Sequence, residues 1–214
     1  MPFLEETDTM ARVELIDTAT ANDPVITEIC AWVTEMEGAV PNHFRVEMNF
    51  PEFFKAKLGA TKVLWQCGEL SLPEIQHVGI AVSKANNCSY CTAAFCTILN
   101  YGLGAREVDV TGFLATGAAA LSDPRLRAIV EFAVKANANP AGLDDTEFAR
   151  LRAHGLSDKG VVQLIHLVSD FASYNRLNLA VQTDYDYRDM FRVVGFGWDP
   201  ATGGAPGDNT RGVR

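Results

Sequence analysis

The sequence predicts an all-α protein, and two observations carry that prediction. Apolar residues recur at intervals of three and four along most of the chain, a spacing that places them on one face of a helix. Residues that begin helices precede these runs, as in Asp23-Pro24 and Asp123-Pro124, where a capping side chain precedes a proline at the first helical position. No segment shows a convincing strand pattern of alternating apolar and polar residues.

The first half of the chain contains signals for four helices. Ser71 and Glu74 have the spacing of a capping box, in which each side chain binds the other residue's backbone N–H. Asn86 and Asn87 interrupt the apolar pattern and, as good N-cap residues, are expected to begin the next helix. Residues 40–45 contain Pro-Asn and are expected to form a turn, in which His43 orders the backbone or lines a subunit contact. The expected helices span residues 24–38, 50–67, 72–85 and 88–102.

The second half contains signals for four more helices. Asp144 and Glu147 repeat the capping-box spacing before a short helix that ends at Gly155. Ser157 is expected to cap the longest apolar segment, whose inward-facing residues include Ile165. The expected helices span residues 105–120, 124–138, 145–155 and 158–182.

The composition is that of one globular domain. The chain has 214 residues, of which 48% are hydrophobic and 21% charged, so it is long enough to bury a core without disulfides or metals. No linker composition occurs within residues 24–195. We therefore expect a helical domain at residues 23–198, an N-terminal arm at 1–22 and a disordered Gly- and Pro-rich tail at 199–214.

The charge and the absence of long apolar runs limit the partners. There are 18 basic and 27 acidic residues, for a net charge of −9, which disfavours binding to nucleic acid or anionic membranes. No run reaches the ~18 apolar residues that a membrane span needs. The first residues lack the basic and apolar regions of a signal peptide, so a cytoplasmic location is expected.

The residues that predict chemistry are Cys88-x-x-Cys91. Two cysteines three apart at a helix start share one face, at a Cα separation of ~5 Å that permits a disulfide. Free backbone N–H groups and the positive end of the helix dipole stabilise a thiolate there. A stabilised thiolate beside a second cysteine is what dithiol–disulfide chemistry requires. A redox pair is therefore favoured over the alternatives, a metal site or small core residues.

The segment Val82-Ser83-x-x-Asn86-x-Cys88-x-Tyr90-Cys91 resembles the core motif of the AhpD-like alkyl hydroperoxidases, within the carboxymuconolactone decarboxylase superfamily. Residues 40–45 and 174–178 are similar to segments of its peroxidase-related branch, so the resemblance covers about residues 25–180. It implies an AhpD-like helical bundle that assembles as a homo-oligomer: a dimer, trimer or hexamer. It also implies a hydroperoxide substrate and a dithiol reductant of the lipoyl or thioredoxin type.

The sequence departs from that family motif at two positions. The motif carries a Glu and a His that relay protons, and here Gln76 and Phe95 stand in their places. Neither side chain exchanges protons, and general acid–base assistance is worth ~10²–10⁴-fold. The resemblance implies that Cys91 attacks the peroxide and Cys88 resolves the sulfenic acid. Tyr90 is expected to shape the thiolate environment, and Gln76 to hold a water molecule.

These observations favour a thiol-dependent peroxidase or dithiol oxidoreductase of weakened activity, with no cofactor and no metal. The alternative is a catalytically impaired family member that acts as a non-enzymatic oligomeric binding protein or as a thiol redox sensor. The loss of both relay residues favours this alternative, and the retained cysteine pair disfavours it.

Other residues near the motif are candidates to replace the missing Glu and His of the proton relay. His77 is rotated by about 100° from Gln76 around the helix, so a surface or subunit contact is favoured over a supporting catalytic role. Glu74 is favoured as the capping partner of Ser71. Cys96 is expected to be a small buried residue. Farther along the chain, His166 and Asp170 are expected to form a buried hydrogen-bonded pair.

Overall fold

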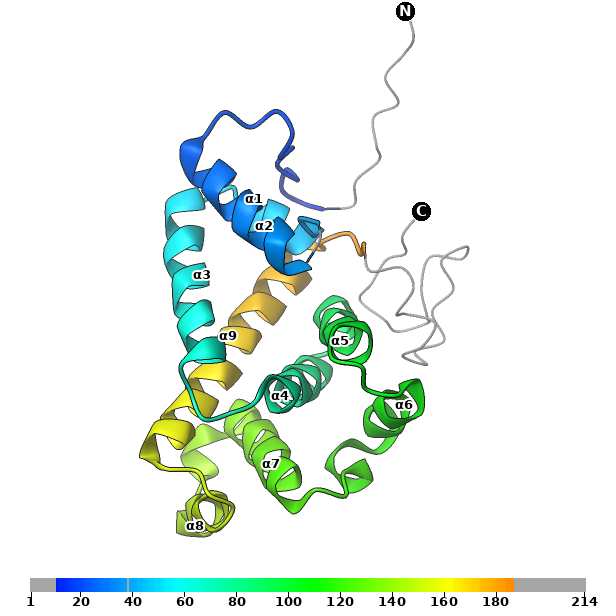
Figure 1. The fold of residues 1–214 in the computed structure, drawn as a ribbon, viewed down its shortest axis with the longest axis vertical. Helices are drawn as coiled ribbons and strands as arrows, with labels where there is room; N and C mark the ends of the chain where they lie inside the picture. The colour runs from blue at the N-terminus through cyan, green and yellow to red at the C-terminus, as the bar shows by residue number, and fades with distance from the viewer. Residues whose placement is uncertain (1–10, 38, 187–214) are drawn as a thin grey trace, which may run out of the picture.

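The structure, a computed structural model, describes residues 11–37 and 39–186, and within these ranges the predicted all-α fold is confirmed (Figure 1). No helix in the described ranges is long and apolar enough to cross a membrane. The expected tail at 199–214 and the first ten residues of the expected arm lie outside the described residues. The α-helices are α1 (Pro24–Glu37), α2 (Asn42–Glu47), α3 (Pro51–Gln66), α4 (Leu72–Ala85), α5 (Ser89–Thr97), α6 (Glu107–Thr116), α7 (Pro124–Ala138), α8 (Asp145–Ala153) and α9 (Asp158–Val181).

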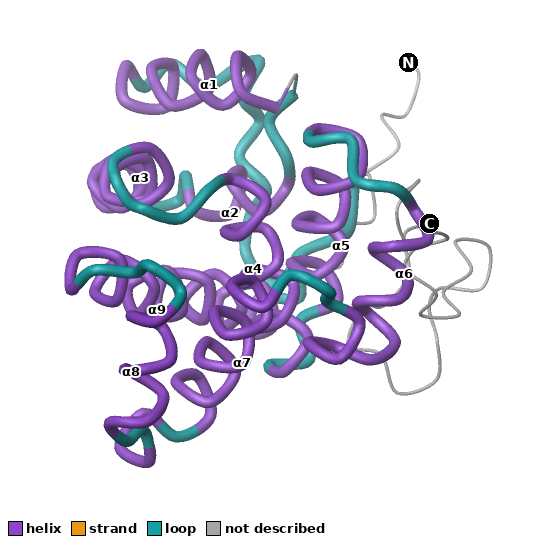
Figure 2. Tube along the Cα trace, turned by 60° about the horizontal axis from the view of Figure 1, so that its bottom comes forward, coloured by secondary structure: helices purple, strands orange, loops and turns teal. Residues whose placement is uncertain are grey.

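Helix α4 lies at the centre of the fold and packs against α5, α7 and α9 (Figures 1 and 2). Ile75, Val78 and Val82 are fully buried and belong to a cluster shared with α7 and α9. Ile80 is also fully buried and belongs to a second cluster, shared with α5, α6 and α7. Burying a side chain of this size stabilises the fold by about 1.5–3 kcal/mol, so α4 is a firm support for the cysteine-bearing α5.

Helices α1, α2 and α3 form a separate group beside α9 (Figure 1). Their cluster includes Ile29, Phe44, Phe54 and Leu58, and Tyr174 of α9 packs into it. Helix α9 therefore carries core residues on two sides, because Leu164 and Phe171 belong to the cluster around α4.

Most predicted helix signals are confirmed. Both capping boxes, Ser71 with Glu74 and Asp144 with Glu147, have both of their hydrogen bonds. The last segment differs in one respect: Ile165, expected to face inward, is 37% exposed. A π-helix over Ile98–Gly102 extends α5, an irregularity that is frequent near functional sites.

Two local predictions are wrong. Residues 42–47 form helix α2 rather than a turn, because Phe44 and Val46 have a core to pack against. Asn86 and Asn87 do not cap α5. Asn86 is the C-cap of α4, and Asn87 adopts a left-handed conformation with φ 57° that ends α4.

Candidate active site

Cys88 itself is the N-cap of α5. Its sulfur accepts a hydrogen bond from the backbone N–H of Cys91 at 3.4 Å. The left-handed turn at Asn87 makes this possible, because it lets α5 begin directly after α4. Both cysteines are buried, at 1% exposure for Cys88 and 5% for Cys91, and both are in the thiol form. The structure thus places the predicted pair at a helix N-terminus, where a thiolate is stabilised.

A cavity of about 230 Å³ opens beside Cys91, and Cys88 is not among its lining residues. Helices α1, α2, α3, α5 and α9 all contribute to its wall. The wall is mostly apolar and rich in rings: Trp32, His43, Phe44, Trp65, Tyr90, Phe95, Phe171 and Tyr174. Cys91 is therefore the sulfur that a bound molecule meets, with Cys88 behind it.

The polar surroundings of Cys91 favour its thiolate. Burial by itself raises the pKa of the Cys91 thiol. Hydrogen bonds with Cys88, Asn175 and Asn178 lower it, and the Nδ2 of Asn178 lies 3.4 Å from the Cys91 sulfur. The positive charge of Lys57 acts in the same direction. Together these contacts place the pKa of Cys91 below its ordinary value, so hydrogen-bond donors and a nearby positive charge favour its thiolate.

Sequence reasoning missed two residues of the candidate site, Asn175 and Asn178 of α9. Asn175 is fully buried and donates to the Ser83 hydroxyl at 2.9 Å, while its own carbonyl oxygen accepts from Asn86 at 2.9 Å. Asn86 also exchanges hydrogen bonds with Asn137 of α7. This network holds Asn175 in position between α4 and α9. A signal existed in the sequence, since residues 174–178 were one of the segments similar to the peroxidase-related branch.

Gln76 and Phe95 occupy the interior next to α5, where neither transfers a proton. The Gln76 side chain is fully buried, and neither its amide oxygen nor its amide nitrogen has a hydrogen-bond partner among the described residues. The Phe95 ring lies against Phe171, with ring centroids 4.7 Å apart. It also covers Gly79, where an added Cβ would lie 2.6 Å from the ring. Phe95 therefore fills the space between α4 and α9 and forms part of the cavity wall.

His77 lies elsewhere, toward α6. Its Nδ1 donates to the carbonyl oxygen of Pro73 at 2.7 Å, and its ring meets the edge of Phe113 at a centroid distance of 5.0 Å. His77 does not line the cavity, so the structure does not bring it together with the cysteines.

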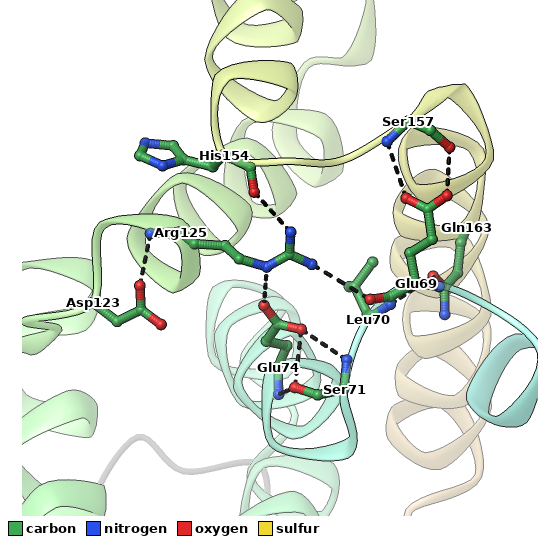
Figure 3. A network of polar contacts seen from close by, with 9 residues as sticks. All are labelled: Glu69, Leu70, Ser71, Glu74, Asp123, Arg125, His154, Ser157 and Gln163. Atoms are coloured by element: carbon green, nitrogen blue, oxygen red, sulfur yellow. Dashed lines mark hydrogen bonds and ion pairs between the residues drawn. The ribbon is translucent and has the colours of Figure 1, made fainter.

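Glu74 belongs to a structural network at the start of α4 (Figure 3). One of its oxygens accepts from Ser71 as part of the capping box, and the other accepts from Arg125 Nε at 2.7 Å. Arg125 in turn donates to the carbonyl oxygen of His154 at 2.7 Å. Both carboxylate oxygens of Glu74 are thus engaged, and the network ties α4 to α7 and to the loop after α8.

Two other expectations about single residues have opposite outcomes. Cys96 is fully buried, as expected, and burial raises the pKa of its thiol to about 12. The expected pair of His166 and Asp170 is wrong. His166 is exposed, and Asp170 accepts a hydrogen bond from the Thr61 hydroxyl at 2.9 Å.

A histidine that sequence reasoning placed in a turn lines the cavity instead. His43 of α2 is half-buried, and its Nδ1 lies 3.1 Å from the Tyr90 hydroxyl. The Tyr90 hydroxyl also accepts from the backbone N–H of His43 at 3.1 Å and donates to Asp186 at 2.8 Å. Loss of solvent lowers the pKa of His43 to about 3, with a further contribution from Lys57. The imidazole is therefore neutral at pH 7.

No cluster of side chains that could hold a metal ion occurs among residues 11–37 and 39–186.

Lys57 is paired with Glu47 at 2.5 Å, and its ammonium group lies 3.5 Å from the centre of the Tyr174 ring. This pair supplies a buried cation near the cavity.

Comparison with known proteins agrees with this geometry. Residues 51–135, which include α3, α4, α5 and α6, match the model of the carboxymuconolactone decarboxylase family. This part of the chain is therefore similar to the carboxymuconolactone decarboxylase family. Among curated proteins, none matches the chain in sequence.

Solved structures of three other proteins show the same fold. A peroxidase-related protein with an alkylhydroperoxidase AhpD core, from Ralstonia eutropha JMP134, is 24% identical and has a TM-score of 0.71, with 85% of this chain and 95% of that chain covered. A peroxidase-related protein from Silicibacter sp. TM1040 is 21% identical with a TM-score of 0.74, covering 89% and 100%. The debrominase Bmp8, solved as a cysteine-to-alanine variant in complex with 2,3,4-tribromopyrrole, is 17% identical with a TM-score of 0.70, covering 86% and 96%. The fold is thus AhpD-like.

Proposed function

We propose that this protein is a thiol-dependent peroxidase that reduces hydroperoxides through Cys91 and Cys88. One observation carries the proposal: Cys91 lines an apolar cavity, and its pKa is lowered by hydrogen-bond donors although it is buried. A low-pKa thiol that a substrate can reach, with a second thiol beside it, is the requirement for peroxide reduction.

Peroxide reduction at these cysteines takes three steps. The Cys91 sulfur attacks the terminal oxygen of a hydroperoxide, the O–O bond breaks, and the thiol proton ends on the leaving alkoxide to give an alcohol. Cys88 then attacks the sulfenic acid of Cys91, which forms a disulfide and releases water. A dithiol reductant of the lipoyl or thioredoxin type returns both cysteines to thiols and is itself oxidised to a disulfide.

The test measures the redox state of the two cysteines by peptide mass spectrometry, before and after stoichiometric hydroperoxide. We expect a Cys88–Cys91 disulfide within seconds in the wild type and none in Cys91→Ser. Cys67→Ser is the matched control, because Cys67 is exposed and outside the cavity wall. If both thiols stay reduced over minutes, the peroxidase proposal is wrong and a non-enzymatic binding role takes its place. Oxidation that a dithiol does not reverse favours a redox sensor.

The ring-rich cavity favours a second candidate, reductive dehalogenation of an aromatic ring. The wall is far more extensive than a peroxide group alone requires, and the fold resembles that of a debrominase. In this reaction an aryl bromide and two thiols are converted to the debrominated ring, a disulfide, a bromide ion and a proton. Cys91 takes the bromine, the ring carbon takes a proton, and Cys88 displaces bromide from the Cys91 sulfur. Bromide release from 2,3,4-tribromopyrrole, with disulfide formation in the same sample, tests this candidate.

We also propose that the chain assembles as a homo-oligomer. Light scattering coupled to gel filtration measures whether the chain forms a dimer, trimer or hexamer.

A further inference from the structure

Three side chains from distant parts of the chain meet at one end of the cavity. They are His43 of α2, Tyr90 of α5 and Asp186, which follows α9. The Tyr90 hydroxyl lies between the other two, 3.1 Å from Nδ1 of His43 and 2.8 Å from Oδ1 of Asp186. The other carboxylate oxygen of Asp186 accepts the backbone N–H of Asn42 at 2.7 Å, which anchors the carboxylate next to His43.

This arrangement determines which nitrogen of His43 carries the proton. A tyrosine hydroxyl has one proton and two acceptor sites. The proton of Tyr90 goes to the Asp186 carboxylate, and one acceptor site takes the backbone N–H of His43. Because its proton is directed to Asp186, the hydroxyl acts as an acceptor toward Nδ1, so Nδ1 is the donor. A neutral imidazole with its proton on Nδ1 has a lone pair on Nε2, which is free to accept a proton.

His43 and Cys91 line the same cavity, and Tyr90 is the residue directly before Cys91 in the chain. Among the described residues, the charged or titratable groups around His43 include Lys57, Tyr90, Tyr174, Asp186 and Cys91. Loss of solvent and the positive charge of Lys57 lower the pKa of His43, so the imidazole is neutral at rest and holds a proton only while passing it from one group to another. The positions where the family motif has its relay, Gln76 and Phe95, provide no such group.

We propose that His43 is the proton-transfer residue of this cavity, and that Tyr90 and Asp186 position it and fix its tautomer. The inference rests on the proposed peroxidase function and replaces the relay missing at positions 76 and 95. As the Cys91 sulfur bonds to the terminal peroxide oxygen, the thiol proton passes through Nε2 to the leaving alkoxide in one concerted transfer, so no free imidazolium forms beside Lys57. His43 ends the step neutral, and the products are a sulfenic acid and an alcohol.

The test compares two oxidants that differ in their leaving groups. Cumene hydroperoxide leaves as a basic alkoxide, which needs a proton, whereas peracetic acid leaves as a carboxylate, which does not. The measurement is the rate of single-turnover oxidation of Cys91, followed by quenching and peptide mass spectrometry. We expect His43→Gln to slow oxidation by cumene hydroperoxide by ~10²-fold or more and to change oxidation by peracetic acid far less.

Two further variants separate proton transfer from folding. Tyr90→Phe keeps the ring in place and removes only the hydroxyl, and we expect a smaller loss with the same preference for peracetic acid. His166→Gln is the matched control, since His166 is exposed on α9 and outside the cavity wall, and it should match the wild type with both oxidants.

The outcomes are distinct. If His43→Gln slows both oxidants equally, or neither, the assigned role of His43 is wrong while the peroxidase proposal stands. If the wild type is oxidised by neither compound, the proposed function fails and this inference fails with it.

Discussion

Replacing Asn178 by leucine removes one of the amides that hydrogen-bond the Cys91 sulfur, while nearly keeping the volume of the side chain. A hydrogen bond to a charged group contributes about 1.5–3 kcal/mol. The contact is long, at 3.4 Å, and Asn175 and Cys88 still donate in the variant, so the lower end of that range applies. At 1.36 kcal/mol per pKa unit, the pKa of Cys91 should rise by about one unit in Asn178→Leu. At a pH below the pKa of Cys91 in both proteins, the thiolate fraction should then fall ~10-fold.

The assay is alkylation of Cys91 by iodoacetamide across a pH series, quantified on the peptide that contains it. Cys96 is an internal reference, because its pKa of about 12 keeps it unreactive in the same range. Asn139→Leu is the control, since Asn139 is exposed at the end of α7. If the midpoint for Cys91 is the same in Asn178→Leu as in the wild type, amide donors do not activate this thiol, and the reasoning about the site is refuted.

Three other predictions concern stability and are measured by urea unfolding. Gln76→Met should raise the free energy of unfolding by about 1–3 kcal/mol, because it removes a buried amide that has no partner among the described residues; a loss of stability would show that the amide has a partner in solution. Gly79→Ala should cost about 1–3 kcal/mol, because the new Cβ would lie 2.6 Å from the Phe95 ring, and an unchanged midpoint would contradict this packing. The wild type should lose stability as the pH falls from 6.5 to about 3, because His43 binds a proton in the unfolded state and not in the folded state over this interval. His43→Gln should show a shallower decline, and parallel curves would mean that His43 titrates normally.

The sequence predicted the helices well because their starts depend on local chemistry. A capping box such as Ser71 with Glu74 is satisfied within four residues, so no distant contact is needed to recognise it. Helix α2 was missed for the opposite reason. Its six residues gain their stability from Phe44 packing on α1 and α3, which a local pattern does not contain.

The candidate site was predicted only in part, for a similar reason. Cys88 and Cys91 are three positions apart in the sequence and were identified from that spacing. The groups that tune them, Asn175, Asn178 and His43, are separated from them by 45 residues or more and arrive through the packing of α2 and α9 on α5. The segment 174–178 had a family resemblance, but neither it nor His43 carries a local pattern that names the cysteines as its partners.

The sulfur of Cys88 caps α5, and this gives the first turn of the helix a dependence on oxidation. While both cysteines are thiols, that sulfur accepts the backbone N–H of Cys91. When a Cys88–Cys91 disulfide forms, the Cys88 sulfur moves toward the Cys91 sulfur. The backbone N–H of Cys91 then loses its acceptor at a buried position, where water does not replace it. The oxidised form would therefore exchange the amide hydrogens of this turn faster than the reduced form. A protein reductant, which cannot enter a cavity of about 230 Å³, would reach the disulfide through the same local opening, and its rate would follow the opening frequency of the turn.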